Sequence, residues 1–197
     1  RQQLNLSKFS AEIQPGLLVE NVNGELQWDA DGHEGRLTAA HLAVTESPLL
    51  ARWLPAEHIV SHYLQQLAPA GHVRQFKSRW QFQKQQWQDY FAEADFDGLH
   101  TQAYQQLPGL RQWAGHLTVE PNAGRLELDT RGASIELAGL LRWPLPIDQL
   151  QGEVSWRHNG QKTLISTRNL LFSNPHLRLR TDLEYQLGAI NGDTIQL

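Results

Sequence analysis

The chain has 197 residues, of which 40% are hydrophobic and 19% are charged. It is therefore long enough for one domain with a core and too apolar to be disordered. A formal net charge of −4 gives no electrostatic reason to bind nucleic acid. The absence of Cys excludes disulfides, thiol chemistry and Cys-ligated metals. The sequence shows no apolar run of about 18 residues that would suit a transmembrane helix and no signal-peptide pattern.

The first clear strand pattern lies at residues 22–28, where Val22, Leu26 and Trp28 alternate with polar side chains. Asp31-Gly32 follows and is typical of a hairpin turn, and a returning strand is expected to pass Leu42 and Val44. The chain opens without Met and ends in a strand-like phrase. We therefore expect it to be an internal piece of a longer protein.

The period changes between Pro48 and about residue 68. Apolar residues in this segment recur at helical spacing, and they are Leu49, Leu50, Trp53, Ile59, Tyr63, Leu64 and Leu67. Pro48 and Pro55 each suit a first helical turn, and Pro69 with Gly71 would end the second helix. We expect two short helices near 48–68 that pack against, or cap, a sheet.

Period-two alternation returns after residue 70 and dominates the rest of the chain. The strand patterns lie at 76–82, 90–96, 117–119, 126–128, 150–156 and 177–187. Turn signals stand between them and near the start of the chain, at Pro15-Gly16, Asn122-Ala123-Gly124 and Asn159-Gly160. The pattern predicts a mainly β protein built from antiparallel hairpins with one buried face.

An internal repeat supports this organisation. Residues 22–28 match residues 150–156 position for position at an offset of 128, and Gly32 then falls on Gly160. A shorter echo leads from 113–117 to 124–128. We expect one domain over 1–197, with repeat-like units at about 19–80 and 110–187 and the helical insert at about 48–68. Such repeats favour an elongated array in which units cover their neighbours.

Candidate catalytic and metal-binding groups are few. His58 and His62 are four residues apart on a predicted helix, as in some zinc sites, but no Glu completes an H-E-x-x-H motif, so surface histidines are the better interpretation. Asp29 and Asp31 resemble the opening of a calcium loop, but Ala40 stands at the position where Glu is needed. We therefore interpret this phrase as a hairpin turn.

Asp95 and Asp97 alternate with Phe96 on a predicted strand, so both carboxylates face away from it. Paired carboxylates can serve hydrolysis, but solvated strand residues are the simpler interpretation. The sequence carries no P-loop, nucleotide-binding glycine motif or nucleophile elbow, and we expect no enzyme activity, no cofactor and no metal. Seven Trp leave open a carbohydrate-binding β-sandwich.

Three phrases in a fixed order resemble the AsmA-like superfamily, and within it the YhdP type. They are residues 67–73 leading to Trp80, residues 107–129, and residues 144–156. Together with the internal repeat, they extend the resemblance over about residues 19–187.

The resemblance implies a long periplasmic protein anchored in the inner membrane. It also implies a strongly curved antiparallel sheet, folded like a taco shell, whose concave apolar groove carries phospholipids between the inner and outer membranes. The implied partners are phospholipid acyl chains, the remainder of the same long chain, and inner- or outer-membrane proteins.

By strand parity we expect the groove to be lined by Leu26, Trp28, Phe76, Trp80, Phe82, Ala92, Phe96, Leu117, Val119, Leu126, Leu128, Val154, Trp156, Leu177, Leu179 and Leu183. Parity assigns these positions only if no β-bulge intervenes, because one bulge moves every later side chain to the other face. A purely structural spacer with a plugged groove remains the second alternative.

Overall fold

A computed structural model describes residues 1–188 except 14–15, 45–64, 85, 106, 138 and 140. It contains eleven strands. They are β1 (Gln2–Ile13), β2 (Leu17–Trp28), β3 (Gly32–Val44), β4 (Ala70–Gln83), β5 (Gln86–Thr101), β6 (Gly109–Glu120), β7 (Ala123–Glu136), β8 (Leu145–His158), β9 (Lys162–Ser173), β10 (Arg178–Thr181) and β11 (Glu184–Gly188).

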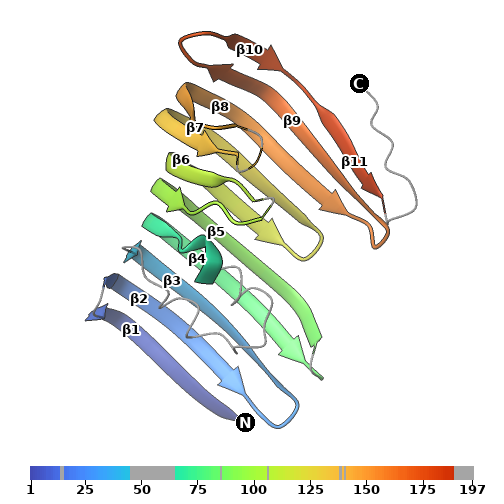
Figure 1. The fold of residues 1–197 in the computed structure, drawn as a ribbon. Coiled ribbons are helices and arrows are strands. Elements are labelled where there is room, and N and C mark those ends of the chain that lie inside the picture. The colour runs from blue at the N-terminus through green and yellow to red at the C-terminus, as the bar shows by residue number, and fades with distance from the viewer. Residues whose placement is uncertain are drawn as a thin grey trace.

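All described strands belong to one antiparallel sheet, and β1 to β10 follow one another in chain order. Figure 1 shows this open, curved sheet from blue β1 to red β10 and β11. The strand β11 pairs with β9, beside β10. The predictions of a mainly β fold and of an antiparallel sheet are confirmed. The sandwich arrangement is not seen in the described part of the chain, because its strands form a single layer.

The two predicted helices near 48–68 are not confirmed. Residues 45–64, which include His58 and His62, lie outside the described residues. In the rest of the segment Gln65–Leu67 are helical, and β4 begins at Ala70.

The two matching hairpins share their strands but not their turns. Asp29 N–H donates to the Gly32 carbonyl at the β2–β3 turn, and Asn159 N–H donates to the Lys162 carbonyl at the β8–β9 turn. The second turn thus lies two residues later than the repeat offset predicts. Gly32 begins β3, whereas Gly160 lies inside its turn with a positive φ of 87°. The repeat predicted the strands correctly and the turn alignment wrongly.

A crease runs across the sheet, along a line of residues with left-handed backbone. These residues are Lys8, Asn21, Gln75, Gly98, Gln112, Gly132 and Asn169. Asn21 of β2 and Gln75 of β4 both lie opposite the Ala39–Ala40 segment of β3. A positive φ inside a strand reverses the alternation of side chains and bends the strand, as in a β-bulge. These positions form groups on neighbouring strands, with Lys8, Asn21 and Gln75 near one level and Gly98, Gln112 and Gly132 near another. We call the band of bends that they form the crease.

Side chains replace the backbone partners that the crease disrupts. Lys8 N–H donates to Asn23 Oδ1 at 2.9 Å, and Asn169 N–H donates to Asp182 Oδ1 at 2.5 Å. The Thr130 hydroxyl accepts from Ala114 N–H at 2.9 Å and donates to the Ala114 carbonyl at 2.8 Å. Buried backbone groups left without partners cost free energy, so these polar side chains lower the free-energy cost of the crease.

The core lies along the crease. One buried cluster joins Leu17, Val19, Val22, Ala39 and Val44, and another joins Leu128, Ala133, Ile147 and Leu150. Away from it, most side chains of the same face are half-buried or exposed. The accessible surface is 13755 Å² for 22.4 kDa, whereas a compact protein of this mass exposes about 9,400 Å². The chain therefore exposes more surface than a compact protein of its mass.

Replacing Thr130 tests the crease. Thr130 is fully buried, so Thr130→Val leaves the Ala114 amide and carbonyl without this partner. We expect a loss of about 1–3 kcal/mol of unfolding free energy in urea titrations followed by circular dichroism. Thr130→Ser keeps the hydroxyl and serves as the control. A larger loss in Thr130→Ser than in Thr130→Val would mean that packing of the methyl group, and not the hydrogen bonds, stabilises the crease.

Candidate functional site

The candidate site is the sheet face that carries the two buried clusters, here called the apolar face. Directly paired residues of neighbouring antiparallel strands project to the same side. The pairs Trp28–His33 and His33–Phe82 place these side chains together, and the pairs Ala92–Val119 and Gly124–Trp156 extend the same face to β8.

Register places the predicted groove residues of the paired strands on the apolar face. On β2 it carries Leu26 and Trp28, on β4 to β6 Phe76, Trp80, Phe82, Ala92, Phe96, Leu117 and Val119, and on β7, β8 and β10 Leu126, Leu128, Val154, Trp156 and Leu179. Leu177 and Leu183 lie in the connections on either side of β10, outside this register. That these side chains line a lipid groove stays a prediction.

On β2 and β7, strand parity missed the residues beyond the crease. On β2 the inward side chains are Val22 and Leu26 before the turn to β3 but Leu17 and Val19 on the other side of Asn21. On β7 the inward set changes from Leu126 and Leu128 to Ala133 and Ile135 after Gly132. An Asn or Gly where an apolar alternation changes parity is the sequence signal that marks the switch, because these residues adopt positive φ most readily.

Glycines on the apolar face lie under large side chains of the neighbouring strand. A Cβ atom on Gly35 would lie 2.6 Å from Cζ2 of Trp80, and one on Gly115 would lie 3.0 Å from Cζ of Phe96. A methyl group on Gly124 would overlap the indole ring of Trp156. The rings thus rest against backbone, and the face is smoother than the size of its aromatic residues suggests.

An aromatic cluster lies on this face near the β2–β3 and β4–β5 turns. His33 stacks on Phe82 with ring centroids 4.9 Å apart, and Trp87 meets Phe82 edge-on at 5.3 Å and Tyr90 at 6.2 Å. Trp80 Nε1–H donates to His33 Nδ1 at 3.2 Å. Trp87 itself is 53% exposed, so the cluster presents an aromatic surface to its surroundings.

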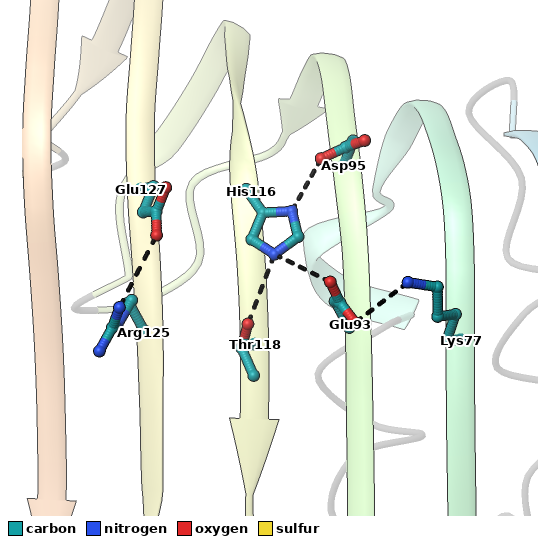
Figure 2. A network of polar contacts seen from close by, with 7 residues as sticks. All are labelled: Lys77, Glu93, Asp95, His116, Thr118, Arg125 and Glu127. Carbon is teal, nitrogen blue, oxygen red and sulfur yellow. Dashed lines mark hydrogen bonds and ion pairs between the residues drawn. The ribbon is translucent and has the colours of Figure 1, made fainter.

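The opposite face of the sheet is polar and is crossed by ion pairs. Lys77 Nζ of β4 lies 3.5 Å from Glu93 Oε2 of β5. Figure 2 shows this pair, and His116 of β6 between Glu93 and Asp95. The contact between His116 Nδ1 and Asp95 Oδ1 is 2.7 Å, and Nδ1 donates in it because a carboxylate accepts. Exposed pairs of this kind contribute about 0–1 kcal/mol each, so this face is chiefly a solvated surface.

One depression on the polar face is lined by Arg125, Glu153 and Arg168, among others, and carries charges of both signs. Asp97 pairs with Arg74 at 3.0 Å, so Asp95 and Asp97 belong to cross-strand ion pairs. The solvated-strand interpretation of these two carboxylates is therefore the one that the contacts support.

The described residues offer little for metal chemistry. Asp31 N–H donates to Asp29 Oδ1 at 3.0 Å, which is the local bond of a turn and confirms a hairpin at the calcium-like phrase. Within the part of the chain that the structure describes, His, Asp and Glu do not gather in groups of three or more that could hold a metal ion. The same part has no helix that is both long and apolar enough to cross a membrane.

Comparison with known families decides the relationship. The family model described as YhdP protein matches residues 2–195. This chain belongs to the YhdP family. The match spans nearly the whole chain, so the YhdP resemblance of its three phrases is confirmed. No curated protein and no solved structure matches the chain.

The contact between Gly124 and Trp156 can be tested by a double-mutant cycle. Gly124→Ala should destabilise the protein by about 1–3 kcal/mol, because the added methyl group displaces the indole ring. The same change in a Trp156→Ala background should cost less. Urea denaturation of the four proteins gives the coupling energy. Additive losses would contradict the ring-on-glycine packing.

Proposed function

We propose that the apolar face is a lipid-binding surface and that this YhdP-family chain is a segment of a bridge-like lipid transporter. In this proposal phospholipids move between the inner and outer membranes along an apolar groove. The protein would act in the periplasm as part of a longer, inner-membrane-anchored chain, without catalytic activity. Its partners would be acyl chains, the rest of the same chain and proteins of the two membranes, and not nucleic acid.

The observation that carries the proposal is the continuity of the apolar face. It extends from Leu4 on edge strand β1, 52% exposed, to Leu179 on β10, 45% exposed. Monomeric soluble proteins rarely expose apolar patches larger than a few hundred Å². Membership of the YhdP family supports the same proposal, because a groove that carries phospholipids is what the resemblance to this family implies.

The chemistry of the face suits binding without fixed positions. Each 100 Å² of acyl chain removed from water contributes about 2.5 kcal/mol, and that contribution has no preferred direction. Aromatic rings that lie on glycine, as at Gly35 and Gly124, add apolar contact area and protrude little from the face. A lipid tail could therefore shift along such a surface without losing a specific partner.

Site-specific crosslinking tests the proposal with adjacent residues of opposite orientation. A photoreactive residue at Leu126, Val154 or Leu179 should form adducts with phospholipid, whereas one at Arg125, Ser155 or Arg178 should not. Mass spectrometry of the crosslinked protein reads out the adducts. Adducts at the polar-face positions alone would refute the proposal. Absence of adducts at all six positions would favour the structural spacer.

A charge on the apolar face should reduce lipid binding. Val154→Glu places a carboxylate where an acyl chain would lie, which costs about 1 kcal/mol or more and lowers affinity roughly fivefold. Ser155→Glu, one residue away on the polar face, is the matched control. Native mass spectrometry of the purified variants measures co-purifying phospholipid. Equal lipid content in the two variants would contradict binding on the apolar face.

A further inference from the structure

Aromatic side chains of the apolar face gather along one of its two rims. This hairpin rim is formed by the β2–β3, β4–β5, β6–β7 and β8–β9 turns, which lie on the same side of the crease. Its aromatic row consists of Trp28, Trp80, Phe82, Trp87, Tyr90 and Trp156.

The aromatic row carries polar atoms as well as rings. Trp80 and His33 are joined by a hydrogen bond, and the Tyr90 hydroxyl donates to the Pro121 carbonyl at 3.4 Å. Trp and Tyr favour positions at the boundary between apolar and aqueous surroundings, because each has an apolar ring and a polar atom. Trp rings also attract cations that approach their faces.

Between the aromatic row and the crease the face is mainly aliphatic, with Phe76 and Phe96 next to the crease. On β7 and β8 it presents Leu126, Leu128, Leu150 and Val154. Gln75 at the crease is five residues from Trp80, and Asn21 is seven residues from Trp28. At about 3.3 Å per residue these stretches span roughly 17 and 23 Å. Half of the hydrocarbon core of a bilayer is about 15 Å thick, so the aliphatic zone is long enough for the tails of one leaflet.

The rest of the apolar face differs from the hairpin rim. Trp113 lies next to the crease residue Gln112, and its ring N–H donates to the Ser134 carbonyl at 3.0 Å. The opposite rim carries exposed leucines such as Leu177, with Trp143 in the loop before β8. The described part of that rim has no aromatic row comparable to the one at the hairpin rim.

We propose that a bound lipid lies on the apolar face in one orientation. Its polar head group lies at the hairpin rim, and its acyl chains extend along the strands toward the crease. The inference rests on the proposed lipid-binding function and adds an orientation to it. The aromatic row would then act like the interfacial aromatic belt of a membrane protein, and the aliphatic zone like the hydrocarbon core.

Trp fluorescence quenching tests the orientation with two probes. The chain is loaded with phospholipid that carries a nitroxide either on the head group or near the end of one acyl chain. Trp87→Phe should remove a component quenched mainly by the head-group label, and Trp113→Phe a component quenched mainly by the tail label. We expect the two components to differ at least about twofold in their head-to-tail quenching ratio.

The outcomes separate the orientation from lipid binding itself. Equal or reversed ratios for the two components would overturn the orientation while leaving binding intact. Absence of quenching by both labels would instead count against the proposed function. Because each variant changes one ring for another, circular dichroism and urea midpoints can verify the fold. Should Trp113→Phe unfold the chain, a double variant that carries Trp87→Phe and Trp156→Phe and keeps Trp113 should show a lower head-to-tail quenching ratio than the unchanged protein, and an unchanged or higher ratio would overturn the orientation.

Discussion

The crease is the constraint on which the rest of this structure depends. A single sheet buries little of either face, and the described core is confined to the line where the strands bend. The bend requires left-handed backbone at residues such as Lys8, Gln75 and Gln112, which costs on the order of 1–3 kcal/mol for each non-Gly residue. Buried contacts around Leu17 and Ile147, both 2% exposed, and side-chain hydrogen bonds such as those of Thr130 oppose that cost. The buried contacts and hydrogen bonds along the crease therefore stabilise the sheet while its apolar face stays uncovered.

The crease also explains what could be predicted from the sequence. Strand positions followed from period-two alternation, and on β2 and β7 the alternation between the hairpin turns and the crease holds the predicted residues on one face. On β2, parity predicts Leu26 and Trp28 but would assign Leu18 instead of Leu17 on the far side of Asn21. The backbone conformation of one residue decides this switch. For Asn21 and Gly132 the residue type gives some warning, but for Lys8 and Gln75 it gives none.

The repeat illustrates the same limit at a larger scale. Trp28 and Trp156 end their apolar stretches in the same way, and both face the same side of the sheet. Yet the first chain reversal closes on Gly32 and the second on Lys162. Strand phrases are fixed by which side chains must lie against the neighbouring strand, whereas turns need only return the chain in register. Similar strands can therefore carry turns of different position, and an offset measured on strands does not transfer to turns.

The two faces of the sheet place different demands on any ligand. On the polar face, Lys77, Glu93 and His116 already satisfy one another across three strands (Figure 2), so a polar ligand there would have to replace existing ion pairs. On the apolar face the half-buried side chains have no such partners to lose, and covering them removes apolar surface from water. Free energy therefore favours an apolar ligand on that face. Because the contacts there are non-directional, the position of such a ligand along the sheet is weakly defined. Its orientation across the sheet is constrained more strongly, since the aromatic row and the aliphatic zone differ in the groups they accept. A surface that fixes orientation but not position suits a ligand that moves.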